Sequence, residues 1–264
     1  HAVPRRLTFA GRGPALRLTC CNSLPNRLMK PVLQHIFRLK RDYARLPFFD
    51  FLRDEALSTR ERLAFFPSMA SFIMAFGDLN RLVLREEPTD DPYLEMINAH
   101  TYEDDHHWPW YLEDFAKLGH DRERMEPGET IRFLYGDATI QNRLLSLRLA
   151  HLIWSAEPVV RLAIIEAIEE TGNVLFALTS KIAARFHNET GVELRYCGEF
   201  HFQLESGHAM NNDHAELATI ELDEAQRRDA LARVDKVFTW FADWTHELLA
   251  YARAAPTAQA GRRA

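Results

Sequence analysis

The chain has 264 residues, 47% of them hydrophobic, so it can bury a large core as one large domain or two small ones. Its formal net charge is −6 and its lysines and arginines are scattered, which argues against a nucleic-acid-binding surface. No apolar run approaches the roughly 20 residues of a membrane span. Three cysteines, two of them adjacent, form neither a disulfide framework nor a cysteine-based zinc site. We therefore expect a cytoplasmic protein without nucleic-acid or membrane partners.

Residues 1–28 differ in composition from the rest of the chain. They carry five arginines and no acidic residue, and Met29 stands directly before the first helical pattern. This composition fits a targeting peptide, and it fits equally well an upstream extension or a disordered tail. We place the folded domain at 29–253, followed by a small, polar C-terminal tail at 254–264.

Apolar residues recur at helical spacing through most of the domain, and no alternating strand pattern is present. Two prolines interrupt the pattern, so we expect a kink at Pro67 and a bend at Pro109. The predicted helices cover 30–46, 58–86, 93–120, 140–156, 158–187, 193–211 and 223–252. The sequence therefore predicts an all-α single domain of about seven helices.

The predicted helix 93–120 concentrates imidazoles and carboxylates, with six of them between positions 100 and 107. Residues three, four and seven apart share a helix face, so His100, Asp104 and His107 line one side. A competing register turns Glu103 and His106 inward instead. We favour the first register because it brings His100 onto the same face, and we expect the neighbouring Asp105 to be solvated.

The predicted helix 193–211 carries a matching set, His201, Glu205 and His208. A carboxylate-x-x-His pair offers oxygen and nitrogen donors from adjacent turns, which iron, manganese and zinc accept. Two such pairs and further carboxylates form the di-metal sites of helical bundles. The glutamates between Glu166 and Glu170 can supply the extra carboxylate, and Asp78 is a weaker candidate in an apolar helix. Read separately, each stretch is also consistent with a solvated polar face.

The spacing of these residues resembles the haem-oxygenase-like iron-containing redox proteins. One shared pattern is His-x-x-acid-acid-x-x-His, followed by aromatic residues and a later Asp and Leu-Gly. The second is His-x-x-x-acid-x-x-His. In this chain the two patterns fall at His100–His107, Trp108, Trp110, Asp114, Leu118-Gly119 and His201–His208. The resemblance covers about 30–253 and implies a haem-oxygenase-like bundle.

The resemblance further implies a non-haem di-iron oxygenase or oxidase, in which two Fe(II), or manganese in their place, activate O₂ to oxidise a small amino-acid-like or fatty-acid-like substrate. Electrons come from a reductase or from the substrate, and a homodimer is one option for the assembly. The implied metal ligands are Asp104, His107, Glu169, His201, Glu205 and His208, with His100, Glu103 and Asp78 as weaker candidates. Apolar substrate contacts are expected from Phe72, Phe76, Trp108 and Tyr111. Two features depart from the family pattern, His100 in place of a glutamate and Pro109 inside a helix that is usually continuous.

Two other classes of function stay open. One is a metal-free hydrolase resembling thiaminase II, for which Cys197 is the candidate nucleophile. The other is a non-catalytic ligand-binding protein on the same fold. Haem ligation by His100 or His107 is a weaker alternative, because an acidic pocket disfavours haem propionates.

Overall fold

The structure is a computed structural model that describes residues 27–122, 125–210 and 213–254, with the backbone alone at 122, 205–210 and 213. The described part is all α-helical and forms one domain, as predicted; its only β pairing is an isolated bridge between Leu28 and Glu221. The expected number of helices was too low. The described residues form twelve α-helices, because two of the predicted helices are interrupted and three short helices, at Pro47–Arg53, Pro127–Tyr135 and Asp213–Leu217, were not predicted.

The helices follow one another as α1 (Lys30–Tyr43), α2 (Pro47–Arg53), α3 (Thr59–Arg62), α4 (Ala70–Leu79), α5 (Pro92–Asp104), α6 (Trp108–Lys117), α7 (Pro127–Tyr135), α8 (Ile140–Trp154), α9 (Pro158–Thr190), α10 (Glu199–Met210), α11 (Asp213–Leu217) and α12 (Glu224–Ala254). Short 3-10 or π-helical turns join several of them, including η2 (Phe66–Met69) and η3 (Asn80–Leu84).

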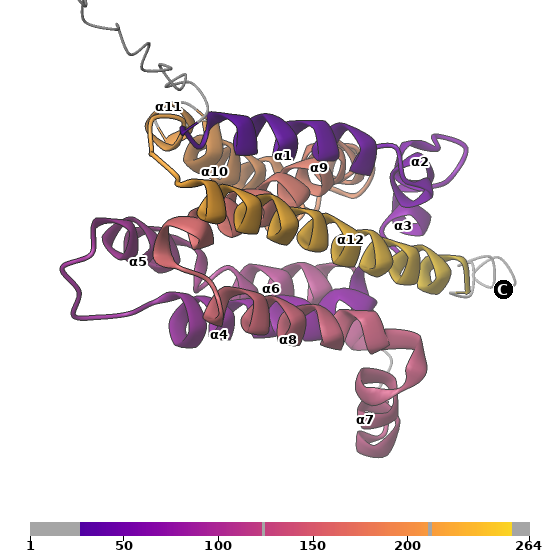
Figure 1. Ribbon diagram of the computed structural model, residues 1–264. Helices are drawn as coiled ribbons and strands as arrows, with labels where there is room; N and C mark the ends of the chain where they lie inside the picture. Colours follow the sequence, from indigo (N-terminus) through magenta and orange to yellow (C-terminus); the bar gives the residue numbers. More distant parts are fainter. Residues whose placement is uncertain (1–26, 123–124, 211–212, 255–264) are drawn as a thin grey trace, which may run out of the picture.

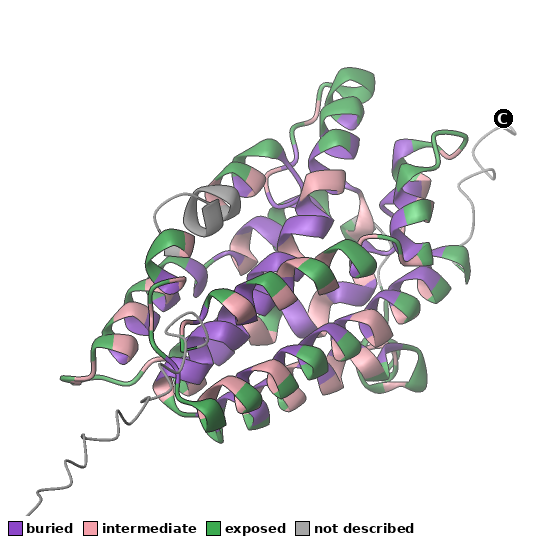
Figure 2. Ribbon diagram, turned by 45° about the horizontal axis from the view of Figure 1, so that its top comes forward, coloured by how far each residue is buried: buried purple, intermediate pink, exposed green. Residues whose placement is uncertain are grey.

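Helix α9 is the centre of the bundle. Its 33 residues pack most extensively against α12 and α10, and also against α1. On the other side, α8 packs against α12 and α4 (Figure 1). Buried residues follow α9 on nearly all sides, whereas the outer helices expose one face to solvent (Figure 2). Helix α7 has no buried residue and projects away from the bundle (Figure 1).

The predicted helix 58–86 is broken near Pro67. It begins with a capping box, in which Ser58 Oγ accepts from the backbone N–H of Glu61 and the Glu61 carboxylate accepts from the backbone N–H of Ser58. The 3-10 turn η2 then contains Pro67 and re-aims the chain into α4. By length and composition alone, Thr59–Leu84 is apolar enough to cross a membrane. Most of this stretch is buried inside the bundle.

The predicted helix 93–120 also ends earlier than expected. Helix α5 stops at Asp104, and α6 starts at Trp108 with Pro109 in its first turn. Gly77 of α4 lies against this break, since a Cβ there would come within 2.9 Å of the carbonyl oxygen of Asp105. The predicted bend after His107 is therefore a complete interruption before it.

Candidate metal centre and cavity

The break between α5 and α6 sets which side chains point inward. Asp104 and His107 are buried, whereas Glu103 and His106 lie on the exposed side. The register favoured from the sequence is the one in the structure. His100 and Asp104 lie on α5, whereas His107 lies beyond the end of that helix, so the three residues do not share one continuous helix face as expected.

Asp105 is buried, contrary to the expectation that it is solvated. Its Oδ2 lies 2.8 Å from Nη2 of Arg85 and 3.3 Å from Nε of Arg81. These guanidinium groups replace the water that an exposed carboxylate would bind, and they offset the cost of burial. Although burial disfavours the ionised form, hydrogen bonds from Arg85, His106 and Arg81 keep the pKa of Asp105 below its usual value.

His100, Asp104 and Glu169 form a compact donor cluster between α5 and α9. Nε2 of His100 lies 3.1 Å from Oδ2 of Asp104 and 3.5 Å from Oε1 of Glu169. One donor atom of each residue lies within 4.8 Å of the other two. Burial by itself lowers the pKa of His100, but the two carboxylates outweigh burial and hold the pKa well above its usual value. The two carboxylates therefore favour the protonated, cationic form of His100.

His107 and His201 meet at the other side of the cluster. Nε2 of His201 lies 3.2 Å from Nδ1 of His107, within hydrogen-bond distance, and both side chains are buried. The ring of Trp110 stacks on His107 at 4.6 Å between centroids and fixes its plane. Nδ1 of His201 donates to the carbonyl oxygen of Tyr196 at 2.8 Å, so the lone pair of the neutral ring lies on Nε2.

The loop that presents His201 is held by Asp114 of α6. The two carboxylate oxygens of Asp114 accept hydrogen bonds from the backbone N–H groups of Arg195 (2.7 Å) and Cys197 (2.9 Å). Burial raises the pKa of Asp114, while these two hydrogen bonds act in the opposite direction. Asp114 thus fixes the backbone on both sides of Tyr196, whose carbonyl orients His201. The sequence pattern included Asp114, but gave no indication that its partner is a loop about 80 residues later.

Two features of these residues are compatible with a bound metal ion. Asp104 is 2% exposed, and its only charged partner among the described residues is His100, which lies 3.1 Å from Oδ2, so this buried carboxylate retains acceptor capacity for a cation. Two nitrogens bound to one ion at about 2.0–2.1 Å lie about 3.0–3.4 Å apart, and the two imidazole nitrogens lie 3.2 Å apart. Imidazole with carboxylate is also the donor set that iron and manganese accept.

The remaining predicted ligands are placed as follows. Glu205 and His208 belong to α10 by backbone, but their side chains lie outside the described residues. Asp78 is exposed on α4 and does not line the cavity. The structure thus brings together Asp104, His107, Glu169 and His201, all of which line one cavity.

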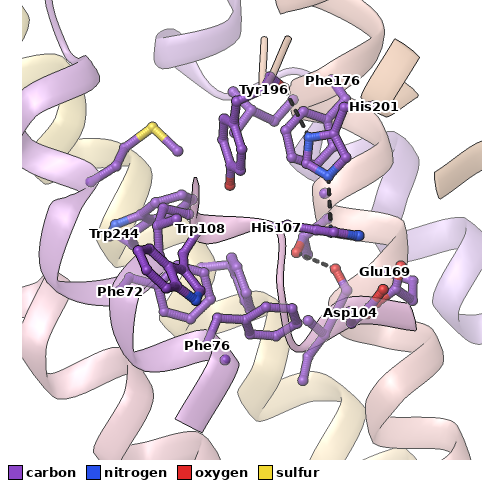
Figure 3. A pocket seen from close by; sticks show the side chains of 18 residues that line it. Phe72, Phe76, Asp104, His107, Trp108, Glu169, Phe176, Tyr196, His201 and Trp244 are labelled. Carbon is purple, nitrogen blue, oxygen red and sulfur yellow. Dashed lines mark hydrogen bonds between the residues drawn. The ribbon is translucent and has the colours of Figure 1, made fainter. Parts of the chain in front are cut away.

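The cavity has a volume of about 70 Å³ and runs from Asp104, His107, Glu169 and His201 to an aromatic wall (Figure 3). Phe72 and Phe76 of α4 and Trp108 of α6 line it, as do Phe241 and Trp244 of α12. Tyr111, the fourth expected substrate contact, instead packs on Phe66 and donates to its carbonyl oxygen at 2.8 Å. Two residues of α12 were missed because the final helix carries no polar motif that would mark it as part of a site.

Cys197 lies in the loop before α10 and does not line the cavity. It is 3% exposed, and burial, with a smaller effect of the nearby Asp114, raises the pKa of its thiol well above the usual value. Reactive cysteines are thiolates in partly exposed, electropositive surroundings. Cys197 is instead buried, and it lies near the acidic Asp114.

A second buried polar group lies between α9, α11 and α1. His214 Nε2 is 2.5 Å from Oε1 of Glu166 and 3.8 Å from Oε1 of Glu170, and Lys40 pairs with the other oxygen of Glu170. One donor atom each of Glu166, Glu170 and His214 lies within 4.8 Å of the other two. Since Lys40 and His214 offset the two carboxylates, we interpret this group as an ion network that holds α11 on the bundle.

Comparison with models of known protein families gives no match for this sequence. A search of curated proteins likewise finds no relative.

Proposed function

We propose that the protein is a non-haem di-iron oxidase or oxygenase of the haem-oxygenase-like class, which uses O₂ to oxidise a small and largely apolar organic molecule. The observation that carries the proposal is the position of His107 and His201. Their nitrogens lie 3.2 Å apart, and they share one cavity with the carboxylates of Asp104 and Glu169. An apolar cavity that ends in imidazole and carboxylate donors suits the oxidation of an apolar substrate.

In this proposal Asp104, His107, Glu169 and His201 hold the iron, with His100 as a further donor and with Glu205 and His208 expected to contribute from α10. Bound iron supplies the redox chemistry of O₂, with electrons from a partner reductase or from the substrate. The tryptophan beside His107 and the carbonyl of Tyr196 keep the two imidazoles in fixed orientations. The aromatic wall excludes water and places the apolar part of the substrate.

His100 has a separate part in the proposal. In the metal-free protein the neighbouring carboxylates of Asp104 and Glu169 raise its pKa and so favour its cationic form. A bound metal cation would offset the charge of the two carboxylates in place of the protonated imidazole, and His100 would then release its proton. The cluster can therefore be electrostatically balanced with and without metal.

Anaerobic titration with Fe(II) tests the proposal. We expect about two irons per chain, as in other di-metal carboxylate bundles, and oxidation of the bound iron when O₂ is admitted. His107→Gln should lose at least one iron. Its sequence neighbour His106 is exposed and pairs with Asp105, so His106→Gln is the matched control and should bind as much iron as the unchanged protein.

Two outcomes would contradict the proposal. Binding of less than one iron per chain by the unchanged protein would favour a metal-free ligand-binding protein. Equal iron binding by His107→Gln and by the unchanged protein would place the metal elsewhere.

A further inference from the structure

Gly172 occupies an unusual place in the central helix. It lies in the middle of α9, between the buried residues Thr171 and Asn173. Glycine is the poorest helix former after proline, because it loses the most backbone freedom on folding. A glycine at such a position is expected to have a conformational or a packing reason.

Neither of the two usual reasons applies here. The φ angle of Gly172 is not positive, so the backbone does not require glycine. A Cβ at this position would meet only ring carbons of Phe176, at 3.5 and 3.8 Å, which are ordinary van der Waals distances. No neighbouring backbone approaches closely, in contrast to Gly77. What distinguishes Gly172 is that it lines the cavity.

We propose that Gly172 is a specificity-determining residue, and that its missing side chain leaves the space that the apolar group of the ligand fills. The inference rests on the proposed function in taking this cavity as the substrate cavity. The described lining residues include no lysine or arginine, and apart from Glu169 and Thr171 the residues of α9 that line the cavity around Gly172 are apolar or aromatic (Ile168, Leu175 and Phe176). The part of the ligand that lies there is therefore uncharged and apolar. Its polar end points toward Asp104, His107 and Glu169.

The test uses the full, metal-free chain and a series of 1-alkanols from 1-butanol to 1-decanol, with binding measured by calorimetry. Each buried methylene should tighten binding about fourfold until the cavity is filled. In Gly172→Ala the chain length at which the affinity stops rising should be one or two carbons shorter than in the unchanged protein. Gly172→Leu should bind the long alkanols at least tenfold more weakly.

Gly128→Ala is the matched control, because Gly128 is an exposed glycine of α7, outside the cavity, whose added Cβ would meet only the end of Arg132. Both alanine variants should raise the thermal midpoint through helix propensity. Only Gly172→Ala should change the preferred chain length. An unchanged chain-length limit in a folded Gly172→Ala protein, or no alkanol binding by the unchanged protein, would overturn the inference. Because no metal is present, a shifted limit would support it even if iron binding failed.

Discussion

Nε2 of His201 lies 3.2 Å from Nδ1 of His107, although 94 residues separate them in the sequence. The contact depends on the break between α5 and α6, which places His107 at the start of a new helix, and on the loop before α10, which orients His201 through Tyr196. Both supports are local and can be changed one residue at a time.

Gly77→Ala should disturb the break between α5 and α6. The added Cβ would lie 2.9 Å from the carbonyl oxygen of Asp105, so α4 and the break must move apart. We expect a loss of about 1–3 kcal/mol in the free energy of unfolding, as for other overpacked positions, and weaker Fe(II) binding because Asp104 and His107 flank the break. Chemical denaturation and Fe(II) titration measure the two effects. Unchanged stability and iron binding would show that this close approach is not required.

Asp114→Ala should weaken the support of His201. It leaves the backbone N–H groups of Arg195 and Cys197 without their acceptors, and each lost buried partner costs about 1–3 kcal/mol. We expect a total loss of about 2–4 kcal/mol in the free energy of unfolding, together with lower iron affinity. The neighbouring Glu113 is half exposed, so Glu113→Ala is the control and should change neither quantity. If both variants behave alike, Asp114 does not hold the loop.

The stability of the protein should depend on pH through His214. The hydrogen bond to Glu166 raises the pKa of His214 in the folded state, despite the opposing effect of burial. A raised histidine pKa gives stability that is fully present below the unfolded-state pKa of about 6.5 and is lost as the pH rises through the folded-state pKa. The thermal midpoint of the unchanged protein should therefore exceed that of His214→Gln by more at pH 6 than at pH 8.5. An equal difference at both values would show that the His214 charge does not stabilise the fold.

Cys197 should resist alkylation while the protein is folded. Its thiol is 3% exposed and its pKa is raised, so little thiolate is accessible to iodoacetamide at pH 8. Peptide mass spectrometry should find Cys197 unlabelled in the native protein and labelled after denaturation. Rapid labelling under native conditions would reopen the thiol-dependent hydrolase as an explanation of the site.

Much of the fold could be predicted because helical periodicity is a local property. The boundaries of α8, α9 and α12 fall within three residues of those expected, since apolar stripes and residues such as Gly191, the left-handed C-cap of α9, mark them. The interruptions at Pro67 and Pro109 were located, but not their extent. Whether a proline bends or ends a helix depends on tertiary neighbours such as Gly77.

The candidate site was predictable in its polar half and less so in its apolar half. Imidazoles and carboxylates at fixed spacing identify a helix face, which is why Asp104 and His107 were distinguished from Glu103 and His106. Aromatic residues form no such pattern in the sequence, where Trp244 cannot be told from a core tryptophan. Only the packing of α12 against α9 shows that it lines the cavity. Asp105 was misjudged for a similar reason, since its partners Arg81 and Arg85 lie on an earlier segment of the chain.

Anomalous diffraction at the iron absorption edge, from crystals loaded with Fe(II) under anaerobic conditions, tests the central claim most directly. The account predicts two anomalous peaks at the end of the cavity, within bonding distance of His107 and His201 and of the carboxylates of Asp104 and Glu169. Iron bound only at Glu166, Glu170 and His214, or no peak at the cavity in iron-loaded crystals, would contradict it.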